Sequence, residues 1–181
     1  MYCHTIEILK NNGVIVENGL TNNEVKEIEE LYGIVFPKSL RAFLMTGVPI
    51  SNGFFNWRDI SPENINHIKL IMNYPIKYPE QNIDEIEWSD RWGDEPPNKI
   101  AVITEIKKRL LTAPILIPVF CHRFMPMMDI ESPPILSIHG TDVIYYGKSL
   151  LDYFNIEFNN KSQSEIDFKG IKYIPFWSDI M

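Results

Sequence analysis

The order of hydrophobic patterns along the chain predicts an α+β fold, with an antiparallel or mixed sheet flanked by helices. Helical spacing dominates residues 20–74, and a run of strand-like segments follows at residues 115–146. One more helical segment comes after them, at residues 149–154. Segregated helices and strands are typical of α+β architectures, whereas parallel α/β sheets need the two to alternate. The 181 residues contain no repeat and no Gly/Ser linker, so we expect one domain over residues 1–181.

The clearest local signal is a helix within residues 20–33. Thr21 and Glu24 form a capping box, in which each side chain satisfies a backbone N–H that the helix leaves unpaired. Apolar residues at helical spacing follow the box. Gly33 supplies the left-handed residue with which many helices end.

A second short helix follows directly. Pro37 suits a first helical position because the N–H that proline lacks is not needed there. We expect the helix to end at Gly47. Asn52-Gly53 then reads as a turn, and the aromatic residues of 54–57 predict a strand.

Ser61 caps a third predicted helix, which we expect to end at Pro75 because a proline ring clashes with the preceding turn. Residues 78–98 then predict a polar loop that is rich in acidic residues and contains two tryptophans. A loop of this length is uncommon unless it is functional or partly helical. Residues 100–111 fit a helix and a strand equally well.

The predicted sheet occupies the second half of the chain. Residues 115–120 form a strand that Pro118 interrupts, which places this strand near a sheet edge. Residues 135–138 and 143–146 form a hairpin around a glycine-containing turn. We expect residues 122–128 to be a loop that joins the first strand to this hairpin.

Two parts of this pattern resemble the SUKH superfamily, which is named for fungal cell-wall regulators and bacterial immunity proteins. The resembling features are the helix ending in Gly33, the Phe36-Pro37 pair, the helix Leu40 to Leu44 with Gly47, and the hairpin Ile135 to Tyr146 with its following helix. The resemblance covers roughly residues 15–160. The region 78–98 has no counterpart in the pattern of the superfamily.

The resemblance implies a non-catalytic α+β domain that binds a partner protein. Bacterial members are often cognate inhibitors of polymorphic toxins, many of them nucleases. We therefore expect an immunity protein that binds and neutralises a cognate toxin, acting as a monomer or weak homodimer. The alternative is a general interaction module, like the fungal regulators of the superfamily.

The charge balance favours a protein partner over nucleic acid. The chain has 17 Lys and Arg against 24 Asp and Glu, a net charge of −7. Binding to phosphates needs clustered cations, so we expect no nucleic-acid ligand. A negative surface instead raises the rate of encounter with a basic protein.

No apolar run approaches the ~20 residues that span a bilayer, so we expect no membrane association. The first residues lack a signal-peptide pattern, which makes the cytoplasm the expected compartment.

An enzyme is the remote alternative, as a Cys-dependent hydrolase. Cys121-His122 suggests a thiolate beside a base, and such a thiol needs a depressed pKa. Neighbours along a strand point to opposite faces, so the two side chains would not meet if the strand continues. His4, His67 and His139 remain as histidines that could reach the thiol. Because free cysteine is usually a small buried hydrophobe, we expect no enzymatic activity.

The spacing of the histidines, cysteines and glycines does not predict a metal site or a nucleotide site. The histidines show neither H-x-x-x-H nor H-E-x-x-H, and the two cysteines match no zinc pattern. Glycine-rich phosphate loops and the G-x-S-x-G motif are also missing from the sequence. We expect no metal and no cofactor.

Tryptophan and arginine in predicted loops are the best candidates for partner contacts, because interface hot spots favour these residues. Three segments carry them: the end of the predicted strand 54–57, the acidic loop 78–98, and the connection 122–128. The predicted contact residues are Trp57, Arg58, Trp88, Arg91, Trp92, Arg123 and Phe124. The carboxylates of the acidic loop are expected to mimic phosphates toward a basic toxin.

Overall fold

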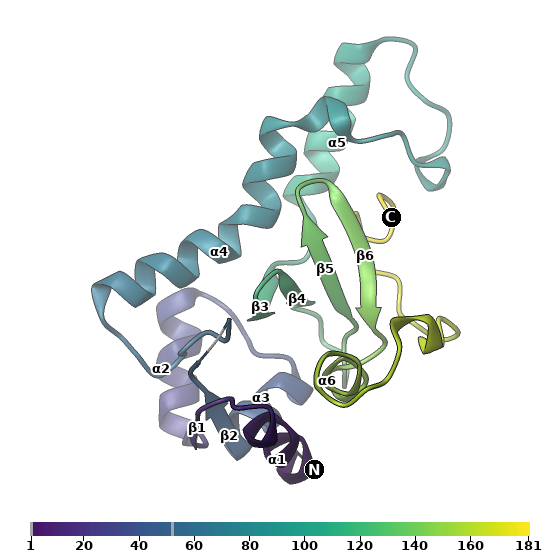
Figure 1. The fold of residues 1–181 in the computed structure, drawn as a ribbon. Coiled ribbons are helices and arrows are strands. Elements are labelled where there is room, and N and C mark those ends of the chain that lie inside the picture. The colour runs from purple at the N-terminus through teal and green to yellow at the C-terminus, as the bar shows by residue number, and fades with distance from the viewer. Residues whose placement is uncertain (1, 52) are drawn as a thin grey trace.

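A four-stranded antiparallel sheet lies at the centre of the fold, with helices gathered around it (Figure 1). The computed structural model describes residues 2–51 and 53–181. The helices are α1 (Cys3–Asn11), α2 (Asn22–Tyr32), α3 (Lys38–Thr46), α4 (Pro62–Gln81), α5 (Lys99–Leu111) and α6 (Leu150–Phe158), with short 3-10 helices η1 (Ile83–Glu85), η2 (Asp90–Trp92) and η3 (Gln163–Glu165). The strands are β1 (Val16–Asn18), β2 (Gly47–Pro49), β3 (Leu116–Phe120), β4 (Arg123–Pro126), β5 (Ile135–His139) and β6 (Asp142–Gly147).

The architecture is a single-domain α+β fold, as predicted. The larger sheet has the order β3-β4-β5-β6, and β1 pairs with β2 in a separate two-stranded sheet. All pairs that join these strands are antiparallel. Of the two sheet types expected, the structure therefore has the antiparallel one.

The capped helix is confirmed in α2. The Thr21 hydroxyl accepts from the Glu24 N–H at 3.2 Å, and the Glu24 carboxylate accepts from the Thr21 N–H at 2.7 Å. Gly33 ends the helix in the left-handed region, with φ of 65°. The sequence did not predict α1, β1 or β2, which are short and carry no capping or turn signal of comparable strength.

The second helix is confirmed as α3, and it ends at Gly47 as expected. Gly47 has an extended backbone and also begins β2. A Cβ there would lie 2.9 Å from side-chain atoms of Ile6 and Val16, so close packing is what requires the glycine. The turn predicted at Asn52-Gly53 includes Asn52, which lies outside the described residues.

The predicted strand 54–57 is wrong. Only Phe54 forms a bridge, with Phe120, and the following residues make local turns. One of these turns is closed by the Trp57 N–H, which donates to the Phe55 carbonyl at 3.0 Å. The aromatic side chains raise the strand propensity of this segment, but they fill the core from a turn instead.

The predicted end of the third helix at Pro75 is also wrong, because α4 continues through Pro75 and Pro79 to Gln81. Each proline removes one backbone donor and strains the turn before it, at a cost of about 3 kcal/mol. Both rings are buried, so packing against the rest of the fold offsets this cost. The first residues of the predicted loop 78–98 belong to α4, and the remaining residues contain η1 and η2. Residues 100–111 are resolved as helix α5, which Asn98 caps.

The predicted strands of the second half are confirmed, and one more is added. Strand β3 carries Pro118 and lies at the sheet edge. Strands β5 and β6 form the hairpin, whose turn contains Gly140 with φ of 67°. The predicted loop 122–128 is wrong, because β4 lies within it and pairs with both β3 and β5. Its four residues are all buried and so lack the alternation that marks a strand.

The larger sheet is covered on both faces. Ile117, Val119 and Met125 join a core with α1, α2, α3 and α6. Side chains on the other face join a second core with α5, residues 83–92 and the C-terminal tail, in which Trp177 is fully buried. Coverage on both faces explains the continuous apolar pattern of the strands. Helix α4 contributes to both cores and runs along the end of the sheet where the strand turns lie (Figure 1).

Candidate partner-binding surface and cavity

Four of the seven predicted contact residues lie in the interior. Trp57, Trp92, Arg123 and Phe124 are only 2–9% exposed. Aromatic side chains bury a large apolar area, so they are efficient core residues even when they come from turns. The four side chains are therefore not available on the surface to a partner, and Arg58, Trp88 and Arg91 remain.

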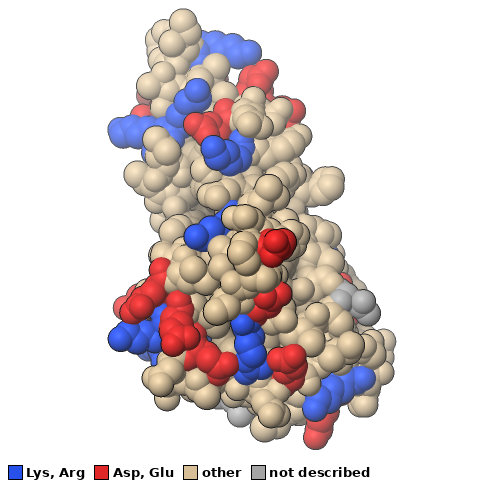
Figure 2. Space-filling model, turned by 90° about the vertical axis from the view of Figure 1, so that its left-hand side faces the viewer, with Lys and Arg blue, Asp and Glu red and all other residues tan. Residues whose placement is uncertain are grey.

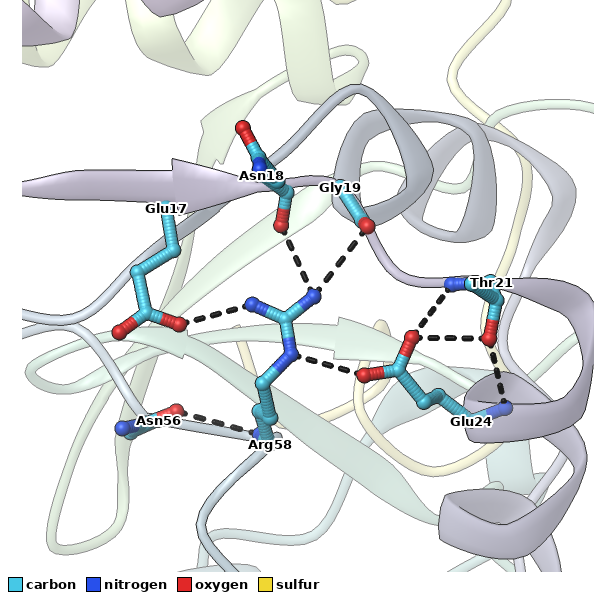
Figure 3. Close-up of polar contacts among 7 residues, drawn as sticks. All are labelled: Glu17, Asn18, Gly19, Thr21, Glu24, Asn56 and Arg58. Atoms are coloured by element: carbon cyan, nitrogen blue, oxygen red, sulfur yellow. Dashed lines mark hydrogen bonds and ion pairs between the residues drawn. The ribbon is translucent and has the colours of Figure 1, made fainter.

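Arg58 is held by four acceptors near the start of α2 (Figure 3). Its Nε donates to Glu24 at 2.8 Å, and its Nη1 donates to Glu17 at 2.7 Å. Its Nη2 donates to the carbonyls of Asn18 and Gly19 at 2.9 and 3.2 Å. These bonds tie the turn after Trp57 to the segment between β1 and α2. A guanidinium engaged in this way acts as a structural tie more than as a free contact residue.

Glu24 belongs to both the capping box and this tie. The backbone N–H of Thr21 and then the Arg58 guanidinium lower the pKa of Glu24 to about 2. Because the folded pKa lies below the ordinary value of 4.5, the charged carboxylate stabilises the fold at neutral pH. This contribution is lost as the pH falls through the folded pKa.

We expect the variant Glu24→Gln to be less stable than the wild type at pH 7, by up to about 1 kcal/mol, because the pair is partly exposed. Glutamine can keep the capping box but not the charge. The difference should shrink as the pH falls from 4.5 toward 2, where the wild-type carboxylate also becomes neutral. Urea unfolding at several pH values measures it. Glu27→Gln, an exposed position on the same helix, is the control. A Glu24→Gln difference that does not change with pH would contradict this account.

Trp92 anchors the acidic region to the C-terminal tail. Its indole N–H donates to Asp179 at 2.8 Å, and Asp179 also accepts from the Tyr173 hydroxyl at 2.8 Å. The Arg109 guanidinium lies over the Trp92 ring, 5.2 Å from its centroid. Trp88 packs edge-on against Trp92 and donates to the Gly93 carbonyl at 2.8 Å. This part of the predicted loop is therefore fixed in place.

Residues 84–95, hereafter the acidic segment, present six exposed carboxylates on this scaffold. They are Asp84, Glu85, Glu87, Asp90, Asp94 and Glu95. Of these, Glu85 accepts from the Thr141 hydroxyl at 3.3 Å, and the other five make no hydrogen bond or ion pair with the described residues. Arg91, the one cation of the segment, lies over the Tyr173 ring at 5.6 Å. The acidic segment therefore concentrates negative charge on a backbone that is held in place.

The face that carries α4 has a different charge distribution (Figure 2). Figure 2 shows Lys and Arg interspersed with Asp and Glu on this face, including a group of adjacent acidic side chains at the lower left with a basic side chain beside it. Interspersed charges favour solubility and do not steer a partner strongly. Separately, none of the helices within residues 2–51 and 53–181 is long and apolar enough to span a membrane.

A cavity of about 510 Å³ opens beside α4, at the end of the sheet where the strand turns lie. Its floor is apolar and consists of Phe54, Phe55, Ile71, Phe124 and Ile138. Polar side chains stand around this floor: His67 and Tyr74 from α4, Cys121 and His122 from the β3–β4 turn, and His139 from the end of β5. His67 and His139, two of the histidines that could reach Cys121, line the same cavity as the thiol. The aromatic floor and Tyr74 carry no sequence spacing that would have indicated them.

The environment of Cys121 does not activate its thiol. Cys121 and His122 lie in a turn, where Cys121 has a φ of 46°, so the premise of a continuing strand does not hold. Burial and then the nearby Glu157 raise the pKa of the Cys121 thiol. A nucleophilic cysteine needs the opposite shift. The hydrolase alternative therefore loses its activating feature.

His122 is biased toward its neutral form. Burial, Arg123 and His139 each lower its pKa. Among the described residues, no group of three or more His, Cys, Asp or Glu side chains has the arrangement of a metal site. The cavity therefore combines polar side chains with an apolar floor.

Comparisons of the chain with protein-family models, with curated proteins and with solved structures found no match. The resemblance to the SUKH superfamily therefore stays a prediction that depends on the sequence pattern alone.

Proposed function

We propose that this protein is a cytoplasmic immunity protein that binds a cognate toxin, with the acidic segment as its main contact surface. The observation that carries the proposal is the set of six exposed carboxylates on a backbone that Trp92 pins to Asp179. A surface that is already ordered loses little conformational entropy when a partner binds. The resemblance to immunity proteins supports the same function.

The charge of the segment suits a toxin that acts on nucleic acid. Such enzymes hold phosphates with clustered Lys and Arg, and spaced carboxylates can occupy the same groove. A negative field also increases the association rate with a basic partner. An inhibitor that must capture its toxin soon after synthesis benefits from both effects.

Trp88 and Arg91 are the proposed anchors within this surface. Trp88 is half-buried, and its bond to Gly93 fixes the orientation of the indole. Arg91 is exposed beside it. Preordered tryptophan and arginine side chains are the residues that most often dominate binding energy at interfaces.

The test is affinity capture of the tagged chain from its native cells, repeated with the product of the neighbouring gene co-expressed. Recovery of one stoichiometric toxin, together with protection of cells that express it, is the expected result. Stoichiometric recovery of a partner without toxic activity would instead favour a general interaction module. Failure of both captures, with no protection, would overturn the proposal.

Neutralising part of the acidic segment should slow toxin binding. The triple variant Asp84→Asn, Glu87→Gln, Glu95→Gln removes three exposed charges that make no hydrogen bond with the described residues. We expect a roughly tenfold lower association rate at low ionic strength, with the difference fading as salt is added. Stopped-flow binding with the captured toxin measures it.

A matched triple variant provides the control for this experiment. Glu27→Gln, Glu63→Gln, Asp129→Asn changes the net charge by the same amount at exposed positions outside the acidic segment. Its association rate should stay within about twofold of the wild type, because electrostatic steering depends on local field more than on net charge. Equal slowing by both variants would contradict a specific role of the segment.

A further inference from the structure

We propose that the cavity beside α4 is a binding site for a small aromatic carboxylate, independent of toxin binding. The first observation is where the histidines lie: three of the four in the chain line this one cavity. They come from three separate elements, α4, the β3–β4 turn and the end of β5. Only the tertiary fold brings these imidazoles together.

The floor of the cavity suits an aromatic body. Phe54, Phe55 and Phe124 supply aromatic surface, and two isoleucines complete it. The volume of about 510 Å³ falls within the size range of small-molecule sites. Such sites combine an apolar lining with a few convergent polar groups, and this cavity has both.

The polar groups can donate to an anion. The Tyr74 hydroxyl accepts from the Gly140 N–H at 3.2 Å, so its own hydrogen remains free to donate. His122 and His139 lie with ring centroids 6.3 Å apart, and each imidazole carries a donor. Although the chain contains 24 Asp and Glu, the described residues that line the cavity include none. A carboxylate would therefore meet donors there without meeting a like charge.

Electrostatic complementarity with His122 favours an anionic ligand over a neutral one. Burial, Arg123 and His139 oppose protonation of His122. A bound carboxylate would reverse the electrostatic part of that opposition and favour the imidazolium form. Binding would then be coupled to proton uptake and would tighten as the pH falls.

The other ionisable groups around the site are consistent with this coupling. Tyr74 and His67 face the cavity from α4, and Cys121 faces it from the turn. Glu157 acts on Cys121 rather than lining the cavity. Asp142 pairs with His139 in the hairpin register, but it too is outside the lining.

The experiment uses indole-3-acetate as the probe, followed by the Cε1–H resonances of the four histidines in NMR titrations. We expect the probe to shift the resonances of His67, His122 and His139 and to raise the titration midpoint of His122. His4, which is exposed on α1, is the internal control and should not move. Between the free and the bound titration midpoints of His122, affinity should fall roughly tenfold for each pH unit, as uptake of one proton requires.

Matched ligands and variants test separately the contribution of the ligand's charge and that of the histidines. Indole-3-acetamide has the same body without the charge and should bind more weakly and independently of pH. The double variant His122→Gln, His139→Gln should lose the pH dependence, while His4→Gln should behave as the wild type. Equal binding of acid and amide, equal shifts at all four histidines, or no shift at millimolar probe would each overturn the proposal. None of these outcomes depends on whether a toxin binds.

Discussion

Replacing Trp57 with alanine is expected to lower the free energy of unfolding by about 3–5 kcal/mol, the range typical of a large aromatic removed from a core. The Trp57 ring is fully enclosed and packs edge-on against Tyr32 and Phe36, at centroid distances of 5.3 and 5.1 Å. These contacts join α2, the segment before α3 and the turn that Arg58 ties down. The melting temperature should fall by roughly 10 °C for a chain of this size.

Trp88→Ala is the control that distinguishes a core tryptophan from a surface one. Trp88 is half-buried and makes one hydrogen bond, so its loss should cost only about 1 kcal/mol. Chemical unfolding measures both variants, and toxin binding is measured on the folded fraction. Trp57→Ala should leave binding per folded molecule unchanged, while Trp88→Ala should weaken it. The reverse pattern would show that Trp57 contacts the partner.

Replacing Arg123 with methionine is expected to destabilise the fold by about 3 kcal/mol, because it leaves a carboxylate without its cation in a largely buried setting. The Arg123 guanidinium lies 3.7 Å from the Tyr146 ring centroid and donates to the Ser137 hydroxyl at 2.9 Å. Its Nε lies 3.6 Å from Glu157 Oε2, an ion pair too long for a hydrogen bond. The pair therefore depends on charge attraction more than on hydrogen bonding.

The double variant Arg123→Met, Glu157→Leu tests this explanation. Removing both charges should recover most of the loss, because an apolar pair can replace a buried ion pair at little cost. A double-mutant cycle by urea unfolding isolates the coupling between the two residues. A double variant as unstable as the sum of the singles would mean that Arg123 acts through Tyr146 and Ser137 rather than through Glu157.

Local signals in the sequence were sufficient for much of the fold. The capping box of Thr21 and Glu24 and the end at Gly33 were correct because both depend on backbone hydrogen bonds within a few residues. The hairpin and the edge position of Pro118 were correct for the same reason. Strand β4 was missed because both of its faces are covered, which removes the alternation that identifies a strand.

Packing between residues far apart in the chain determined the features that local sequence patterns did not predict. A proline ends an isolated helix, yet α4 continues through Pro75 because its burial against the rest of the fold offsets the cost. A tryptophan in a polar loop has the same local pattern whether it serves as an anchor or as a core residue. Trp92 is buried because it packs in the second core, where Asp179, 87 residues later, accepts its N–H.

The α+β class, the capped helix, the hairpin and the density of acidic residues in the segment 84–95 could all be predicted from the amino-acid sequence. These features depend on composition, periodicity and hydrogen bonds between near neighbours. Which predicted contact residues reach the surface, and which histidines share a cavity, became known from the three-dimensional structure. Burial and proximity are set by residues far apart in the chain, and no spacing within a single element encodes them.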